Sequence, residues 1–170
     1  MPQKVAVFGS AFNPPSLGHK SIVDRLNHFD QVLLVPSIAH AWGKSMPDFG
    51  LRCEWVEAFI KDLAQENVRL CRVEEEMYTG EEAITTYALL DRLTEDHPDA
   101  TFTFVLGPDN FLNFSKFYKA EEILSRWSVL ACPETVKIRS TKIREYLASG
   151  QDISEMTTPS VAGKIQLKQK

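Results

Sequence analysis

The chain has 170 residues and a formal net charge of −4, and 44% of its residues are hydrophobic and 25% charged. This length and composition predict one globular domain over residues 1–170, and the mild negative charge gives no overall attraction for nucleic acid or anionic membranes. No apolar run approaches the roughly 20 residues that span a bilayer, and no signal-peptide pattern opens the chain. The three cysteines, Cys53, Cys71 and Cys132, have neither disulfide nor metal-ligand spacing, so we expect a cytoplasmic protein with no nucleic-acid or membrane partner.

Short apolar runs alternate with longer amphipathic segments along the chain. The predicted strands are residues 4–10, 31–37, 68–73, 101–107 and 127–133. The predicted helices are residues 21–29, 51–66, 81–96, 120–127 and 140–150, with a short C-terminal helix over 163–170. Several strands are almost continuously apolar, which is typical of strands covered on both faces. This order predicts an α/β fold with a Rossmann-like, doubly wound parallel sheet.

Right-handed crossovers place the carboxyl ends of all such strands along one edge of the sheet. Ligands bind at that edge, near the point where the strand order reverses. Functional residues are therefore expected in the segments that follow the strands. Three of these segments are unusual: residues 9–19, 106–118 and 138–144.

The first segment, GSAFNPPSLGH over residues 9–19, joins the first predicted strand to a helix. Gly9 permits a tight turn or a close approach of the backbone to a ligand, and two prolines stiffen the loop. Gly18 and His19 stand where the free N–H groups of a helix N-terminus favour anions. The segment predicts a phosphate site, and a rigid turn capped by Ser16 is the alternative.

The late segment, IRSTKIR over residues 138–144, opens a predicted helix. We expect Ser140 or Thr141 to cap that helix, while Lys142 and Arg144 bring positive charge to the same turn. Hydroxyls, free amides and cations at one helix N-terminus suit a polyphosphate. A capped helix with a solvated basic face is the alternative.

The middle segment, LGPDNFLNFSKFY over residues 106–118, follows a buried strand directly. An Asp in the place of Asp109 commonly accepts ribose hydroxyls in α/β nucleotide-binding folds, although Asp109 would also serve as a helix N-cap. Four aromatic residues recur at helical spacing, and such a stripe belongs to a core more often than to a ligand platform: Phe111, Phe114, Phe117 and Tyr118.

Together these segments resemble the nucleotidyltransferase superfamily that carries an early HxGH or TxGH signature and a late ISSTxIR signature. Within it the chain is most similar to the nicotinate-nucleotide adenylyltransferase family of NAD synthesis. The early family motif, G-G-[ST]-F-D-P-x-H-x-G-H, corresponds to residues 9–19, and the late motif to residues 138–144. The family's G-x-D…F-x-x-W-Y segment corresponds to Gly107, Asp109, Phe114, Phe117 and Tyr118, with Phe117 in the place of the usual Trp.

This resemblance implies that a mononucleotide phosphate attacks the α-phosphorus of ATP and that pyrophosphate leaves together with Mg²⁺. Such chemistry needs positioning and charge neutralisation more than it needs proton transfer. The implied partners are ATP and a phosphorylated small-molecule acceptor, which in this family is nicotinate mononucleotide. A homo-oligomer is also compatible with the sequence.

The resemblance also assigns roles to residues. His19, Ser16 and Arg144 are the expected catalytic residues. Nucleotide binding is expected of Gly9, Ser10, Phe12, Gly18, Gly107, Asp109, Ser140 and Thr141. Acceptor binding is expected of Lys44, Thr85, Phe117 and Tyr118, with Phe117 stacked on the pyridine ring. No residue is assigned as a metal ligand.

The chain departs from the family pattern in other places as well. Ser16 replaces the first His of HxGH, Asn13 replaces an Asp, and only residues 134–137 separate the last predicted strand from the late motif. Three hypotheses therefore stay open. The chain is a nicotinate-nucleotide adenylyltransferase, a related adenylyl- or cytidylyltransferase with another phosphorylated acceptor, or a non-catalytic nucleotide-binding relic of the family.

Overall fold

A computed structural model of the chain describes residues 2–40 and 45–168. Its centre is a five-stranded sheet in the order β3-β2-β1-β4-β5, and every neighbouring pair of strands is parallel. The strands are β1 (Gln3–Ser10), β2 (Gln31–Pro36), β3 (Val68–Leu70), β4 (Ala100–Leu106) and β5 (Ser128–Ala131). The predicted doubly wound, parallel α/β sheet is confirmed.

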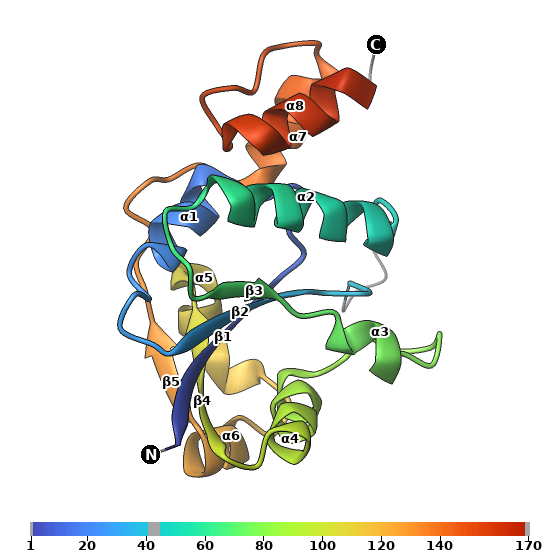
Figure 1. The fold of residues 1–170 in the computed structure, drawn as a ribbon. Helices are drawn as coiled ribbons and strands as arrows, with labels where there is room; N and C mark the ends of the chain where they lie inside the picture. The colour runs from blue at the N-terminus through green and yellow to red at the C-terminus, as the bar shows by residue number, and fades with distance from the viewer. Residues whose placement is uncertain (1, 41–44, 169–170) are drawn as a thin grey trace.

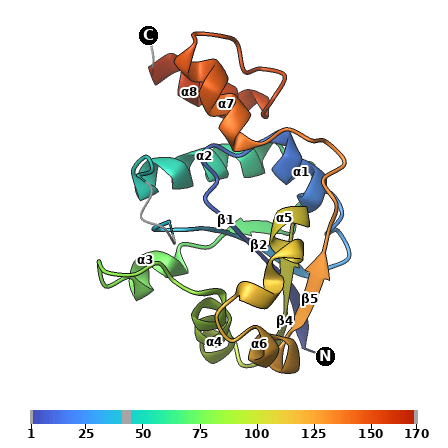
Figure 2. The same cartoon turned by 180° about the vertical axis from the view of Figure 1, so that it is seen from behind.

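Helices cover both faces of this sheet. The helices are α1 (Leu17–Val23), α2 (Phe49–Asp62), α3 (Val73–Met77), α4 (Thr86–Asp96), α5 (Pro108–Leu112), α6 (Ala120–Arg126), α7 (Ser140–Ala148) and α8 (Pro159–Lys168), with a 3₁₀ turn, η1, at Phe114–Lys116. Helices α1 and α2 lie on one side of the sheet and α4 and α6 on the other, while α7 and α8 form an outer layer beyond α2 (Figures 1 and 2). The last two helices therefore stand next to the N-terminal loop that precedes α1.

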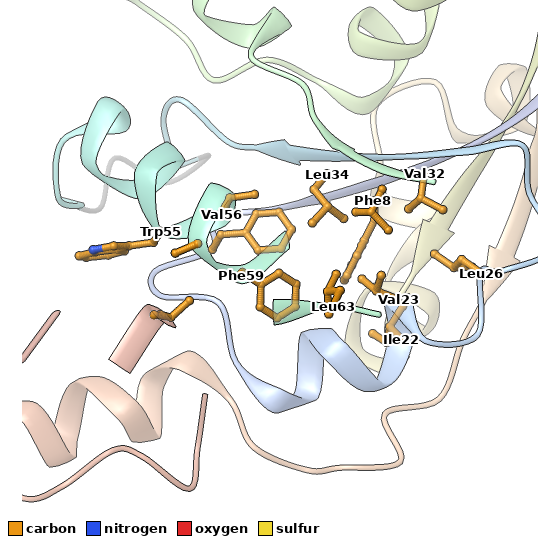
Figure 3. Close-up of a cluster of buried hydrophobic side chains, with 14 of the residues drawn as sticks. Phe8, Ile22, Val23, Leu26, Val32, Leu34, Trp55, Val56, Phe59 and Leu63 are labelled. Atoms are coloured by element: carbon orange, nitrogen blue, oxygen red, sulfur yellow. The ribbon is translucent and has the colours of Figure 1, made fainter. Parts of the chain in front are cut away.

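Two hydrophobic clusters fill the space on either side of the sheet. The first lies between the sheet and helices α1 and α2, and Figure 3 shows Phe8 and Leu34 of the strands near Phe59 of α2 and Leu26, which follows α1. The second lies between the sheet and helices α4 and α6. Alternate residues of β1 enter the two clusters, Ala6 and Phe8 on one side, and Val5 and Val7 on the other. This explains why the strand sequences are apolar without a break.

Several element boundaries differ from the sequence-based prediction, and local hydrogen bonds explain two of them. Helix α1 begins four residues before the predicted start at residue 21, because Ser16 caps it. Helix α4 begins at Thr86, five residues after the predicted start, because the Thr85 side chain accepts a hydrogen bond from the Ala88 N–H at 3.1 Å. The predicted strand 68–73 ends at Leu70, and the short helix α3 follows it.

The strand order reverses between β1 and β4. The crossover from β1 leads through α1 to β2, whereas β4 continues through α5 and α6 to β5 on the opposite side. The loops that leave β1 and β4 therefore part at this point, and ligands of such sheets bind there. No helix among the described residues is long and apolar enough to cross a membrane. The three cysteines are free thiols, and burial raises the pKa of each.

Candidate active site

His19 lies directly after the turn that leaves β1, and both of its ring nitrogens have hydrogen-bond partners. The Nδ1 atom accepts from the backbone N–H of Ser16 at 2.9 Å, and Nε2 lies 3.0 Å from the Ser10 hydroxyl. Beneath the ring, Phe12 packs with its centroid 4.8 Å away, and its side chain is fully buried. Ser10, Ser16 and the ring of Phe12 thus hold the imidazole in one orientation.

These contacts determine the form of the imidazole. Because Nδ1 accepts an amide N–H, the proton of the neutral ring resides on Nε2, which donates to Ser10. Burial lowers the pKa of His19 from 6.5 to about 4, so the ring is neutral at physiological pH. A second proton on Nδ1 would also displace the Ser16 N–H. His19 is therefore a neutral hydrogen-bond donor whose donating atom faces an exchangeable hydroxyl.

The Ser16 side chain is buried and contacts His19 at the start of α1. Its hydroxyl accepts from the His19 N–H at 3.2 Å and lies 3.1 Å from His19 Nδ1, and its side chain is only 1% exposed. It therefore caps α1 and holds His19, which is the alternative that the sequence left open. In this structure Ser16 positions His19, and its expected contact with phosphate stays a prediction.

The N-terminus of α1 is also less open than the sequence predicted. Its Leu17 N–H donates to the Met156 carbonyl at 2.9 Å, and the His19 N–H donates to Ser16. Two amides that were expected to face a phosphate are thus already paired. Ser16 and the chain before α8 thus take two of the α1 donors, and the anion site at Gly18 stays a prediction.

Helix α7 meets the β1 loop, as the two signature motifs require. The Ser140 hydroxyl donates to the Pro14 carbonyl at 2.6 Å, and Arg144 Nη1 donates to the Asn13 carbonyl at 2.8 Å. Arg144 Nη2 also donates to the Thr141 hydroxyl at 3.1 Å. Residues more than 120 positions apart in the sequence are therefore assembled into one site.

The N-terminus of α7 has the open character that α1 lacks. Its N-cap is Arg139, and no side chain makes a capping hydrogen bond to it. The predicted cap by Ser140 or Thr141 is wrong, because Ser140 is the first helical residue and directs its hydroxyl to the β1 loop. First-turn amides without a side-chain cap, next to the Arg144 guanidinium, form a better anion site than α1 does.

Gly18 packs against the short segment that enters α7. A side-chain Cβ at this position would lie 2.4 Å from the Ile138 carbonyl oxygen and 3.2 Å from that of Val136. Only glycine leaves room for this contact, which brings the late motif up to α1. The glycines Gly9 and Gly107 are under no such constraint, because a Cβ at either would meet protein atoms at 3.6 Å or more.

Asp109 lies in the first turn of α5, where Gly107 is the N-cap. Its carboxylate is exposed and forms an ion pair with Arg139, whose Nη2 lies 3.4 Å from Oδ1. Arg139 also lies 3.9 Å from Glu134, a largely buried carboxylate beside Gly18. The pair connects the loop after β4 to α7, and in this state the Asp109 carboxylate is occupied by Arg139.

The expected acceptor-binding residues are not all together. Thr85 lines a cavity of about 800 Å³ between the loops after β2 and α3. Phe117 packs on Phe104, with ring centroids 6.4 Å apart, in the second hydrophobic cluster. The exposed Tyr118 ring meets Tyr87 edge-on at 6.4 Å. The remaining residue, Lys44, lies outside the described part of the chain.

The sequence did not predict two buried charged residues: Arg52, which lines this cavity, and Glu74, which binds the backbone of the lining residue Ile38. Arg52 of α2 is 1% exposed, and Glu74 of α3 is 5% exposed. Burial raises the pKa of Glu74 from 4.5 to about 7, partly offset by the Ile38 N–H that it accepts at 3.1 Å and by the charge of Arg52. Both residues belong to charged, helix-forming segments, so the sequence offered no signal of their burial.

The chain is similar to known proteins in sequence and in structure. Residues 7–149 match the cytidylyltransferase-like family. The chain belongs to that family. A probable nicotinate-nucleotide adenylyltransferase of Myxococcus xanthus is 30% identical to this family member, over 90% of this chain and 86% of the relative. That of Anaeromyxobacter dehalogenans strain 2CP-1 is 26% identical, over 98% of this chain and 95% of the relative.

A solved structure is more similar still. The crystal structure of a candidate nicotinate-nucleotide adenylyltransferase from Vibrio parahaemolyticus superposes with a TM-score of 0.87 at 55% identity, covering 96% of this chain and 99% of that one. Within the cytidylyltransferase-like family, this chain is therefore an adenylyltransferase of the nicotinate-nucleotide group. The resemblance inferred from the three loop segments is confirmed.

Proposed function

We propose that this family member transfers the AMP group of ATP to nicotinate mononucleotide and releases pyrophosphate. The observation that carries the proposal is the meeting of the His19 loop and the open N-terminus of α7 at the β1/β4 switch point. The adjacent cavity of about 800 Å³ offers space for a second substrate. The names of its relatives support nicotinate mononucleotide as the acceptor.

In this proposal His19 acts as a neutral donor to the α-phosphate of ATP. Its Nε2–H now donates to the Ser10 hydroxyl, and a phosphate oxygen in the same direction would take over that bond. A donor held by fixed contacts stabilises charge that develops in the transition state without a reorganisation cost. Ser16 and Phe12 contribute by holding the ring in place.

The β- and γ-phosphates are assigned to α7. Ser140, Thr141 and Arg144 stand at its first turn, where amide N–H groups and a guanidinium favour several anionic oxygens. Arg139 brings a further cation to the same turn. Asp109 remains our candidate for the ribose, and its ion pair with Arg139 would open or shift as the nucleotide enters. Gly9 and Gly107 leave space beside these groups.

We propose that Mg²⁺ enters with ATP. Across residues 2–40 and 45–168 there is no group of three His, Cys, Asp or Glu side chains placed to hold a metal ion. The described residues thus fit a Mg²⁺ ion that is bound mainly by phosphate oxygens and water, as is usual for this ion. When bound, Mg²⁺ neutralises charge on the leaving pyrophosphate.

The acceptor would occupy the cavity beside Thr85, with Lys44 and Phe117 as its further candidate contacts. We place Tyr118 at the margin of this site, because its ring packs on Tyr87. A cytoplasmic location, a single domain over residues 1–170 and assembly into a homo-oligomer remain predictions from the sequence.

The test is a substrate panel with the purified full chain. The protein is incubated with ATP, Mg²⁺ and nicotinate mononucleotide, and both pyrophosphate and the dinucleotide are assayed. Parallel reactions replace the acceptor by nicotinamide mononucleotide, phosphopantetheine or glycerol phosphate, and ATP by CTP. Turnover that is greatest with ATP and nicotinate mononucleotide supports the proposal. Greater turnover with another pair, or nucleotide binding without any turnover, contradicts it.

A further inference from the structure

Arg52 is the largest fully buried side chain among the described residues. No role that the sequence predicts explains its burial. It projects from the second turn of α2 and lines the cavity that the proposed function gives to the acceptor. A buried guanidinium is costly unless its donors are paired, so its contacts show what it is for.

Arg52 donates to three backbone carbonyls in two loops, the one after β1 and the one that joins β2 to α2. Its Nη1 donates to the carbonyl of Ala11, in the loop after β1, and to that of Ser37, in the loop after β2, both at 2.8 Å. Its Nε donates to the Pro47 carbonyl, just before α2, at 3.0 Å. The planar guanidinium therefore fixes the spacing of the ATP-side loop and two walls of the cavity.

Glu74 supports the same wall from the opposite side. Its Oε1 accepts the N–H of Ile38, the residue after Ser37, at 3.1 Å. No ion pair joins Glu74 to Arg52 within the part of the chain that the structure describes, although their charges attract through space. Each residue is thus used to bind backbone, and the loop after β2 is held at two successive residues.

We infer that Arg52, supported by Glu74, is a positioning residue that sets the acceptor cavity at a fixed distance from the ATP-binding loop. The inference rests on the proposed function, since it concerns the acceptor of that reaction. In-line attack requires the acceptor oxygen to lie within a narrow range of the α-phosphorus, and a misplacement of about 1 Å can lower the rate of such a reaction about 100-fold. Arg52 acts through Ala11, Ser37 and Pro47 and needs no contact with either substrate.

Arg52→Lys is the main test, because lysine keeps the charge but lacks the planar fork that reaches three carbonyls. We expect the KM for nicotinate mononucleotide to rise about tenfold or more, with the KM for ATP within about threefold of the wild-type value. A residue needed only for folding would lower kcat by reducing the active fraction and leave both KM values unchanged. That result would overturn the inference.

Arg69→Lys is the matched control. Arg69 also donates to backbone carbonyls, those of Glu66 and Val68, but it lies on β3 away from the cavity. It should leave both KM values within about twofold of wild type. Glu74→Leu is the second variant, in case Arg52→Lys does not fold. It removes the acceptor for the Ile38 N–H and should raise the acceptor KM about threefold.

Calorimetric titration with nicotinate mononucleotide separates a failure of the positioning role from a failure of the proposed function. If the wild type is active and both variants keep its acceptor KM, the positioning role is wrong and the proposed function stands. If the wild type shows neither turnover nor binding of nicotinate mononucleotide, the proposed function is wrong and the inference falls with it. Weaker binding by Arg52→Lys than by Arg69→Lys supports the inference even where turnover is slow.

Discussion

The half-buried His19 and the buried Arg52 are two polar centres on the same edge of the sheet, and their hydrogen-bond partners differ. His19 is neutral, and its donating Nε2 faces the hydroxyl of Ser10. Arg52 keeps a permanent charge, and its donors face three backbone carbonyls in two loops. One centre is thus a network of small rotatable groups, and the other is a rigid connection between segments of main chain.

The difference indicates which centre exchanges partners with a ligand. A serine hydroxyl can rotate away and bond to water when a phosphate oxygen replaces it, so opening the His19–Ser10 bond costs little. A buried carbonyl that loses its donor remains unpaired, at about 1–3 kcal/mol for each group. His19 is therefore suited to contact substrate and Arg52 to hold the frame. The substitutions below test that division.

His19→Ala should have the largest effect. Loss of one preorganised donor at a reacting phosphate lowers kcat by about 10²–10³-fold, while the affinity for ATP falls much less. Steady-state kinetics combined with calorimetric titration of ATP would separate the two quantities. His28→Ala, at an exposed histidine, should change neither. A kcat close to wild type in a folded His19→Ala variant would remove His19 from the reacting centre.

The sequence predicted the strands and the meeting of the two signature segments for a physical reason. Uninterrupted apolar runs such as residues 101–107 leave few alternatives to a buried parallel strand, and topology then brings the loops together. The form of His19 was beyond prediction, since it depends on which groups reach each ring nitrogen. Arg52 was missed because an arginine in an amphipathic helix is normally solvated, and two of its acceptors, Ala11 and Ser37, lie outside its own segment of the sequence.

The N-terminus of α1 also shows what the sequence alone does not predict. The sequence offered capping of α1 by Ser16 as an alternative to phosphate binding, and the structure shows that cap. The partner of the Leu17 N–H is the carbonyl of Met156, which is almost the whole chain away. Local patterns identify a helix start, but only the fold decides which of its amides remain free.

Glu74→Gln should change how stability depends on pH. Burial raises the pKa of Glu74 from 4.5 to about 7, so the folded protein binds more protons than the unfolded chain between these values. The free energy of unfolding of the wild type should therefore fall as pH rises through this range, by about 3 kcal/mol from this group. Glutamine keeps an acceptor for Ile38 and does not ionise, so the variant lacks this loss.

Denaturant unfolding of both proteins at about pH 5 and pH 8 measures the effect. His19 contributes with the opposite sign, because its lowered pKa costs stability as pH falls from 6.5 to about 4. That contribution is common to the wild type and to Glu74→Gln, so it cancels in their difference. An equal stability gap between the two proteins at both pH values would show that Glu74 is not shifted.

Gly18→Ala tests the contact between the nucleotide-side centre and α7. The added Cβ would lie 2.4 Å from the Ile138 carbonyl, so the entry to α7 must move. We expect a loss of about 1–3 kcal/mol in the free energy of unfolding and a raised KM for ATP. Gly163→Ala is the control, because a Cβ there meets nothing within 4 Å and alanine favours helix α8 by about 0.5–1 kcal/mol.

Phe117→Ala should have the smallest effect, and it tests whether Phe117 contacts the acceptor. The ring packs on Phe104 and lies 5.1 Å from Phe114, so part of its surface is already used in the core. If the exposed remainder stacks on a pyridine ring, a loss of about 1 kcal/mol should raise the KM for nicotinate mononucleotide about fivefold without changing that for ATP. Phe111→Ala, at a ring that is 57% exposed, should alter neither. A lower stability with an unchanged acceptor KM would instead make Phe117 a core residue, and the pyridine would then be held by the walls that Arg52 and Glu74 set.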